Sequence, residues 1–520
     1  MINKIFISKI IKYFLFILLL KTGTAFALGG GGELVIVANQ EPQSMASSKA
    51  YKEVNAVGLR NIIEFLTRLD NETGEVKGQL ATSWEQVTPT SMHFKLREGI
   101  KFHDGTLMNA EAVALNLNFL YDSENKFDIL EMMGPQITAE VVDEYTVAVN
   151  TEAPDPMLAK RLYMAGITSA KQILENTDQH YTTPIGTGPY IFDEWKNGEY
   201  YTANKNPDWW GINDPDTYGK IFYDSVRVIW RSESLVRSAV VESGEGHVGM
   251  FITAEECDRL KDASGVTCIP QASDTFLQYR LDYDDRDDGT HPLLMDPNFR
   301  KAIFTGIDWN GIQSAFMGLG SPVQGQSLPS SAIGFNDSLS QYPYDPEGAK
   351  AIVDSYKGKG LETFTLHSST RVGSTARNGE MIEAIGAMLS YIGINNTVAV
   401  EEPGVFNPRA VAKPTDKRSY AWLHVRNNPL MDFGADLKSH TGCDGVISVY
   451  CDPEYEARLD KALTLSGKER DEALQVLVKE THDLYVIGTV GLLQRAYAVP
   501  EGFNWEFGAD HRMVAVNMSE

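Results

Sequence analysis

Cysteine and basic residues are scarce in this 520-residue chain. It has four cysteines, too few for a disulfide-built miniprotein, and a chain of this length can bury a large core without them. Lys and Arg total 46 against 70 Asp and Glu, so the formal net charge is -24. An acidic surface repels nucleic-acid phosphates and gives no general attraction to anionic membranes. These shortages exclude a disulfide scaffold and argue against nucleic-acid binding as the main role.

The common signatures of enzymes are also missing. The sequence has no GxSxG elbow, no GxxxxGK[ST] loop and no HExxH. The run GTGP at 186–189 lacks the third glycine of a dinucleotide loop and precedes a predicted strand. Ten histidines are scattered without metal-ligand spacing, and His103-Asp104 stands at a turn, where we interpret it as structural. We therefore predict no catalytic residue, no metal site and no cofactor.

The N-terminus has the pattern of a secretory signal. Three lysines precede an apolar run at 13–20, and Ala-Phe-Ala at 25–27 is a small-x-small cleavage site. The run is too short for a membrane span, which needs about 20 residues; the alternative is an anchor that is never cut. Removing 1–27 takes away four lysines and no acid, which leaves 42 against 70, or -28. We predict a cleaved signal peptide and a periplasmic protein without a membrane anchor. The first cysteine is Cys257, so lipoprotein modification is excluded.

The cysteines form two close pairs in sequence, Cys257 with Cys268 and Cys443 with Cys451. Neither pair is CxxC, which argues against a thioredoxin-like site, and zinc would need tighter spacing. An even count in an exported chain favours two local disulfides. Four buried free thiols are the alternative.

Predicted helices and strands interleave, which indicates α/β sheets, and the length suggests two to four domains. Apolar spacing and capping signals predict helices over 54–69, 109–121 (with Asn109 as N-cap), 232–243, 297–316, 346–356, 378–392 and 454–484 (broken at 466–467). Alternation and β-rich runs predict strands over 33–39, 93–96, 141–149, 363–366, 396–400 and 419–425, with a hairpin at 190–204.

Residues 80–113, LATSWEQVTPTSMHFKLREGIKFHDGTLMNAEAV, carry the most specific pattern. The stretch resembles the signature of the bacterial extracellular solute-binding protein family 5, the dipeptide-, oligopeptide- and nickel-binding proteins of ABC importers. It departs at Ala112, where the family usually has Asp. Further landmarks follow in family order: GTGPY at 186–190, NPDWWG at 206–211, ESGEG at 242–246, DPNFRKAIFTGID at 296–308 and YIGI at 391–394.

The resemblance implies an α/β fold of the two-lobed, type II periplasmic binding protein kind, with hinged lobes and an extra subdomain inserted in the N-terminal lobe. The implied boundaries are 28–60, 185–280 and 498–520 for the N-terminal lobe, 61–184 for the subdomain and 281–497 for the C-terminal lobe. A monomer would close over a solute in the interlobe cleft and dock on the permease subunits of an importer. The Cys443–Cys451 pair resembles a local disulfide of dipeptide-binding members.

Peptide-binding relatives hold the α-amino group of the peptide with an Asp four residues before a Pro. Here the Pro is Pro429 and the position holds Val425, flanked by His424 and Arg426. An ammonium group buried there without a partner would cost several kcal/mol. Amine capture at this position is therefore disfavoured, although Asp432 or Asp436 could replace the missing acid.

Other ligand-binding candidates follow from the same resemblance. Arg371 follows a strand at about the place where dipeptide-binding relatives grip the ligand carboxylate, for which a bidentate guanidinium is suited; the alternative is a packing role. Trp422 provides either an apolar wall or plain core, and Asn428 lies near it in sequence. In the N-terminal lobe the segment 40–51 should line the cleft, with the candidates Gln43, Ser44 and Met45; the alternative is an ordinary loop. We interpret His103, Trp84 and Trp210 as fold residues.

The predicted function is the periplasmic solute-binding component of an ABC importer that captures a peptide or a peptide-like carboxylate. The missing Asp keeps a second hypothesis open, in which the solute is an oligosaccharide, an opine-like metabolite or a metal chelate. An exported hydrolase would need a nucleophile and a base, and the sequence offers no such pair. A chaperone or signalling receptor that uses the same closure is a further alternative.

Overall fold

The computed structural model of the chain describes residues 31–49, 58–70, 74–122, 124–125, 127, 129–213, 221–282, 291–318, 321, 324–372, 374–375, 377–411, 419–443, 445, 447–448, 450–505 and 518–519. The predicted signal peptide at 1–27 and the end of the segment 40–51 lie outside these residues. No helix in the described ranges is both long and apolar enough to span a bilayer.

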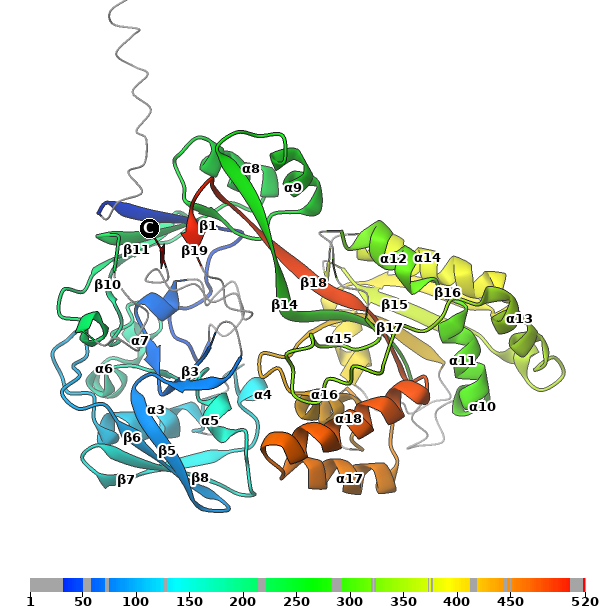
Figure 1. The fold of residues 1–520 in the computed structure, drawn as a ribbon, viewed down its shortest axis with the longest axis horizontal. Coiled ribbons are helices and arrows are strands. Elements are labelled where there is room, and N and C mark those ends of the chain that lie inside the picture. The colour runs from blue at the N-terminus through cyan, green and yellow to red at the C-terminus, as the bar shows by residue number, and fades with distance from the viewer. Residues whose placement is uncertain are drawn as a thin grey trace, which may run out of the picture.

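A ten-stranded sheet runs through the molecule in the order β10-β11-β12-β1-β13-β18-β14-β17-β15-β16 (Figure 1). β1 is parallel to β12 and β13, and β15 is parallel to β16 and β17, as expected for α/β units. The bounds are β1 (Glu33–Ala38), β10 (Tyr190–Lys196), β11 (Tyr200–Lys205), β12 (Ser225–Trp230), β13 (Val248–Gly249), β14 (Val266–Leu281), β15 (Leu366–Arg371), β16 (Asn396–Glu401), β17 (Tyr420–Asn427) and β18 (Ile487–Pro500).

β14 and β18 join the two halves of the sheet. They are antiparallel from Val266↔Pro500 to Arg280↔Ile487, with register shifts between Ala272 and Phe276 and between Leu277 and Gln278. At about 3.3 Å per residue, the 16 residues of β14 reach roughly 50 Å. In Figure 1 they cross from the half that contains β1, here called the first lobe, to the half that contains β15 to β17, the second lobe.

The first lobe packs its core between β1, β10 to β13 and the outer ends of β14 and β18. α8 (Ser234–Glu242) and α9 (Ala254–Leu260) cover those outer ends with a separate apolar cluster. The predicted hairpin at 190–204 is confirmed as β10 and β11, and Gly198 takes the left-handed conformation at its turn (φ 79°).

A small-sheet unit, residues 66–181, has its own four-stranded sheet in the order β5-β6-β8-β7 and its own core. The predicted helix at 109–121 is confirmed as α3, and the side chain of Asn109 accepts from Ala112 N at 3.0 Å. The boundaries 61–184 of an inserted subdomain stay a prediction. The elements in and beside it are η1 (Leu59–Asn61), β2 (Glu64–Phe65), β3 (Thr67–Leu69), β4 (Val76–Gly78), β5 (Ala81–Thr88), β6 (Ser91–Leu96), α3 (Ala110–Leu120), α4 (Leu130–Met133), β7 (Ile137–Asp143), β8 (Thr146–Thr151), α5 (Leu158–Arg161), β9 (Gly166–Ile167), α6 (Ala170–Glu175) and α7 (Thr177–His180).

Two predictions in this part of the chain are wrong. The described part of 54–69 is a 3₁₀ turn followed by short strands, because residues 58–67 are all buried and their apolar spacing therefore marks no single helix face. The segment 141–149 is the turn of a hairpin rather than one strand. There the Asp143 carboxylate accepts from Tyr145 N at 2.9 Å, a local turn that interrupts the alternation.

The second lobe covers both faces of its sheet with helices, and each face has its own apolar cluster. Helices of the α11–α14 group pack on one face and those of the α15–α18 group on the other. The predicted helix at 297–316 is two helices because Asp308 caps the second one, and the predicted break at 466–467 is confirmed. The strand predicted at 363–366 begins only at Leu366. The bounds are α10 (Pro292–Met295), α11 (Pro297–Thr305), α12 (Trp309–Phe316), α13 (Pro346–Asp354), α14 (Asn378–Tyr391), α15 (Pro403–Val411), α16 (Phe433–Thr441), α17 (Pro453–Leu463) and α18 (Gly467–Asp483).

Candidate functional site

A cavity of about 180 Å³ lies where the two lobes meet the connecting strands. Small-solute pockets occur preferentially at such domain interfaces. Its walls come from the first lobe (251–255), from β14 and β18 (Leu277 and 493–496) and from the second lobe (Phe316, Met317, Ser374, Thr375, Arg377 and Met381).

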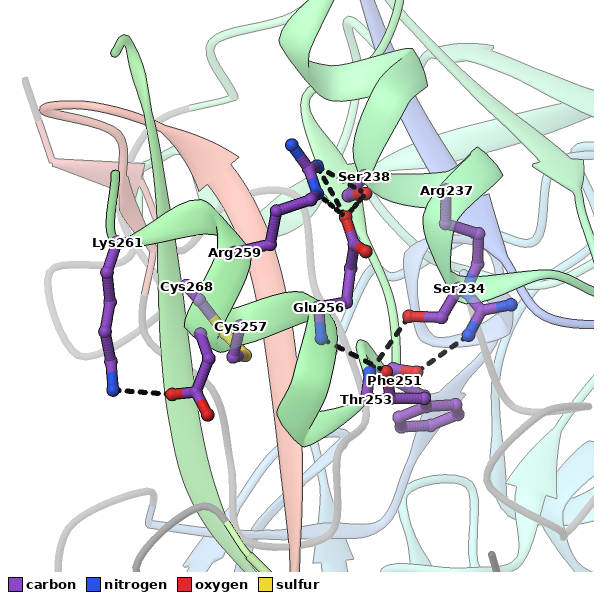
Figure 2. The surroundings of a disulfide bond; sticks show 11 residues. Ser234, Arg237, Ser238, Phe251, Thr253, Glu256, Cys257, Arg259, Lys261 and Cys268 are labelled. Carbon is purple, nitrogen blue, oxygen red and sulfur yellow. Dashed lines mark hydrogen bonds and ion pairs between the residues drawn. A yellow bond between two sulfur atoms is a disulfide. The ribbon is translucent and has the colours of Figure 1, made fainter. Parts of the chain in front are cut away.

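The first-lobe wall is held by hydrogen bonds with side chains of α8, some of which Figure 2 shows. Phe251 has a positive φ of 52°, which is rare for an aromatic residue. The buried Arg237 guanidinium donates to Phe251 O and to Met250 O, both at 2.7 Å, and Thr253 N donates to Ser234 Oγ at 2.9 Å. These bonds stabilise an unfavourable backbone conformation at the cavity wall.

A disulfide fixes the helix behind this wall. Cys257 on α9 is bonded to Cys268 on β14, and next to it Glu256 accepts from Ser238 Oγ at 2.6 Å (Figure 2). Both predicted disulfides are confirmed: the Cα–Cα distances are 5.4 Å for this pair and 4.5 Å for Cys443–Cys451, within the range for such bonds. The disulfide therefore ties α9, whose first residues belong to the first-lobe wall, to the connecting strand β14.

The second-lobe wall contributes a cation and a hydroxyl. The Arg377 guanidinium lies 4.8 Å from the centre of the Phe316 ring and donates to Ala315 O at 2.9 Å. Glu380, and more weakly Glu255 from the first lobe, raise the pKa of Arg377. Thr375 Oγ1 is buried and has no hydrogen-bond partner among the described residues. Arg377 of the second lobe and Glu255 of the first lobe therefore both line the cavity and attract each other.

Arg371 adjoins this cavity. It is the last residue of β15, it is half-buried, and its Nε donates to Ser374 Oγ at 3.4 Å. Ser374 lines the cavity, so the predicted carboxylate-binding residue contacts the cavity wall without being part of it.

Three predicted residues of β17 lie on the opposite face of the same sheet, in a cluster rich in cations. His424 is buried, and burial first, then Arg280, Arg426, His440 and Arg371, lower its pKa well below the ordinary range. Burial and the nearby positive charges therefore favour the neutral imidazole. Sequence reasoning missed Arg280: it is fully buried, and burial together with Arg426 lowers its pKa to about 9. The alternation FLQYRL at 276–281 could have placed it on this face.

Trp422 is part of the apolar cluster on that face. It is 4% exposed, stacks on Tyr420 with 5.7 Å between ring centres, and lies 5.3 Å from the Arg280 guanidinium. Its Nε1 is buried without a hydrogen-bond partner in the described ranges. Trp422 therefore lies in the core on the face away from this cavity, and a role as a wall for the solute stays a prediction.

Val425 has an apolar neighbour on the cavity side. It is paired across the strands with Leu277, which lines the cavity.

The two acids that could replace the missing Asp have other partners. Asp432 is 1% exposed, caps α16 and accepts from Arg470 Nε and Nη2 at 2.8 Å each. Asp436 accepts from Ser327 Oγ at 2.8 Å; burial raises its pKa, but His440 and Ser327 outweigh this and hold it below its ordinary range.

The remaining candidates lie outside the cavity walls. Asn428 is buried and donates to Asp432 O at 2.9 Å. Gln43 is exposed, and Met45 is in the first-lobe core with 0% exposure. Ser44 Oγ donates to Tyr181 O at 3.1 Å, so this stretch packs towards the small-sheet unit. We leave Ser44, Met45 and Asp432 out of the proposed site because their side chains are engaged elsewhere.

The family motifs meet at a buried carboxylate that sequence reasoning did not single out. Glu64 Oε2 accepts from Thr187 Oγ1 and Trp210 Nε1 at 2.7 Å each, and Oε1 accepts from Trp209 Nε1 at 3.1 Å. Burial raises the pKa of Glu64 to about 7. His103 Nε2 lies 3.0 Å from Gly188 O, so the ring joins the motifs at 80–113 and 186–190. These positions agree with the interpretation of His103 and Trp210 as fold residues.

A search of the described ranges for three or more His, Cys, Asp or Glu side chains able to hold a metal ion finds no such group. The cavity wall offers the guanidinium groups of Arg377 and Arg495, the Glu255 carboxylate, hydroxyls, aromatic rings and methionine side chains. Such a set can bind a small solute with an anionic group and apolar parts.

Comparison with known proteins shows what this arrangement resembles. The model of the family described as "Bacterial extracellular solute-binding proteins, family 5 Middle" matches residues 75–440. The glutathione-binding protein GsiB of Shigella flexneri serotype 5b is 27% identical over 66% of this chain and 65% of its own length. Di/tripeptide-binding protein 2 of Pseudomonas aeruginosa is 25% identical over 78% of each chain. The crystal structure of the ABC transporter substrate-binding protein CtaP of Listeria monocytogenes superposes with a TM-score of 0.79 at 19% identity, over 94% of this chain and 99% of that one.

Proposed function

Because the chain belongs to the bacterial extracellular solute-binding proteins of family 5, we propose that it is the solute-binding component of an ABC importer. In this proposal the chain is exported by its signal peptide to the periplasm, captures a solute between the lobes as a monomer and delivers it to the permease. The two connecting strands β14 and β18 act as the hinge. A solute drives closure only through its higher affinity for the closed form.

One observation carries the choice of solute: cations border the cavity, and the family position for an amine-binding acid is apolar. Arg371 and Arg377 lie at or beside the cavity wall, where Val425 pairs with Leu277. A guanidinium binds a carboxylate through two parallel hydrogen bonds, while a buried ammonium without an acid costs several kcal/mol. The solute class that fits is a peptide-like carboxylate that does not depend on a free α-amino group.

The second candidate keeps the same transport role with a non-peptide carboxylate, such as an opine-like metabolite. The same observation favours it, because opine-like solutes carry carboxylates on a secondary amine. A neutral oligosaccharide fits less well, since it would offer no anion to Arg371 beside the cavity. Arg377 already has an anionic partner, Glu380, at 2.8 Å.

A thermal-shift series on the mature chain tests this proposal. Matched probes are a free dipeptide, its N-acetyl form and its C-terminal amide, each at increasing concentration. A ligand at 100 times its Kd stabilises the folded state by about 2.7 kcal/mol. We expect the dipeptide and its N-acetyl form to raise Tm alike and the amide to leave Tm unchanged. A rise with the amide, or a rise that needs the free amine, contradicts the proposed solute class.

Variants of the two arginines separate solute recognition from general stability. Arg371→Gln and Arg377→Gln should each weaken binding of the carboxylate probe by about tenfold or more, as expected for loss of a charge-assisted pair. Arg458→Gln, which removes an exposed arginine paired with Glu480 on the far helices α17 and α18, is the matched control and should leave binding unchanged. Release of a cleaved product from any probe would instead favour the exported hydrolase.

A further inference from the structure

The loop after β17 crosses from the second lobe to the small-sheet unit. Tyr163 OH donates to Pro429 O at 2.8 Å, across 266 residues of sequence. Leu430, 8% exposed, packs in the apolar cluster of the small-sheet unit, whose other buried members all lie between residues 66 and 167. Figure 1 shows the two bodies meeting near α4 and α5 on one side and α16 on the other. The contact joins the second lobe to the small-sheet unit, whose covalent link runs through the first lobe and the strands β14 and β18.

The small-sheet side of this contact is fixed in place. Tyr163 follows α5 and is 0% exposed. Arg60, next to the first lobe, donates to Tyr163 O at 2.8 Å, and its guanidinium lies 5.3 Å from the Tyr163 ring and 4.2 Å from the Phe65 ring. The hydroxyl that reaches Pro429 is therefore held by the first half of the molecule.

The second-lobe side, the loop 428–432, is fixed as firmly. Met431 has a positive φ of 48°, donates its N–H to Asn428 O at 2.9 Å and accepts from Ile333 N at 3.0 Å. The Asp432–Arg470 pair anchors the end of the loop, and Asn428 N donates to Asp274 O on β14 at 2.9 Å. The loop therefore moves with the second lobe and begins beside a connecting strand.

We propose that the loop 428–432 and residues 158–163 form a clasp that holds the lobes closed. The proposal rests on the proposed function in one respect, that the lobes open to admit a solute. Opening would hydrate Leu430 and break the Tyr163–Pro429 bond, so these contacts add to the stability of the closed form alone. Because apparent affinity scales with the closed fraction, the clasp sets affinity without touching the solute.

Lys160 opposes the clasp. It lies on α5, is 7% exposed, and has Asp432 and Arg470 of the second lobe near it. Asp432 is already paired with Arg470, and no carboxylate lies within ion-pair distance of Lys160 in the described ranges. Burial of this ammonium in the closed form costs free energy, in keeping with a pKa that burial lowers to about 8. Replacing Lys160 by an apolar side chain of similar length should therefore strengthen the clasp.

A distance measurement without any solute tests the clasp. Spin labels at Leu174→Cys on the small-sheet unit and Val476→Cys on α18, 72% and 61% exposed, report the separation of the two bodies. The wild-type background should show a short-distance population. Leu430→Ala should lower its ratio to the long-distance population about tenfold and Tyr163→Phe about fivefold. Lys160→Met should raise it.

The matched control is Tyr121→Phe, which removes a tyrosine bond to the backbone oxygen of Met133 inside the small-sheet unit. It should leave the distances unchanged. Identical distances in the wild type, Leu430→Ala and Tyr163→Phe, a wild type without a short-distance population, or a Lys160→Met variant that opens would each overturn the clasp. Since no solute is present, these outcomes do not depend on the solute class proposed above.

Discussion

Replacing the buried carboxylate Glu64 by Gln should make the protein less stable than the wild type in acid, but not in mild alkali. Burial raises the pKa of Glu64 from 4.5 to about 7, while in the unfolded chain it returns to its ordinary value. At about 1.36 kcal/mol per pKa unit, this difference corresponds to about 3 kcal/mol. Because the folded state binds the proton more tightly, this contribution is fully present below pH 4.5 and is lost as the pH rises to about 7.

The amide side chain of the Glu64→Gln variant carries no such pH dependence, but it fits the three donors less well. The protonated acid can donate to Thr187 Oγ1 and still accept from both indoles, whereas the amide must leave one indole N–H facing its own NH₂ group. A buried donor without a partner costs about 1–3 kcal/mol. We therefore expect Glu64→Gln to be less stable than the wild type at pH 4.5 and equal or more stable at pH 8.

Thermal unfolding of both proteins across pH 4.5–8 measures this difference directly. The free-energy advantage of the wild type should fall by about 3 kcal/mol over that range. The matched control is Glu85→Gln at an exposed position of β5, whose difference from the wild type should stay constant. A constant difference for Glu64→Gln as well would refute the account of a buried, largely protonated carboxylate.

Three further predictions concern stability. Arg470→Met leaves Asp432 buried without its ion pair and should cost about 3–5 kcal/mol in urea unfolding; a loss below about 1 kcal/mol would contradict the structural role given to this pair. The double variant Cys443→Ser with Cys451→Ser opens a loop with a sequence separation of 8 and should lose about 2–3 kcal/mol, with the Tm of the oxidised wild type as reference. Burial lowers the pKa of His247 to about 4, so its stabilising contribution is present above pH 6.5 and is lost as the pH falls towards 4; His247→Asn should flatten the acid limb of the Tm profile.

The sequence was sufficient for elements with strong local signals. Asn109 caps its helix as predicted, and the Asn-Gly turn makes the predicted hairpin. The residues 58–67 were misassigned because they are buried on every side, which removes the periodicity that separates helix from strand. The family motifs indicated the α/β two-lobed fold, since they mark turns and packing positions such as His103.

The site was less predictable because its charges come from distant parts of the chain. The order of strand and arginine pointed to Arg371, which lies beside the cavity, and its role in binding stays a prediction. Arg280 and Arg377 were missed, since only the pairing of β14 with β17 and the start of α14 bring them near the other residues. Asp432 looked available in sequence, and only the fold shows its carboxylate paired with Arg470, 38 residues away.

The most direct test of the central claim is native mass spectrometry of the mature protein as purified, followed by identification of the solute that unfolding releases. The account predicts one small molecule per chain that carries a carboxylate, binds without being altered, and loses affinity in Arg371→Gln. A released solute without an acidic group, or one that binds the Arg371→Gln variant as tightly as the wild type, would contradict it.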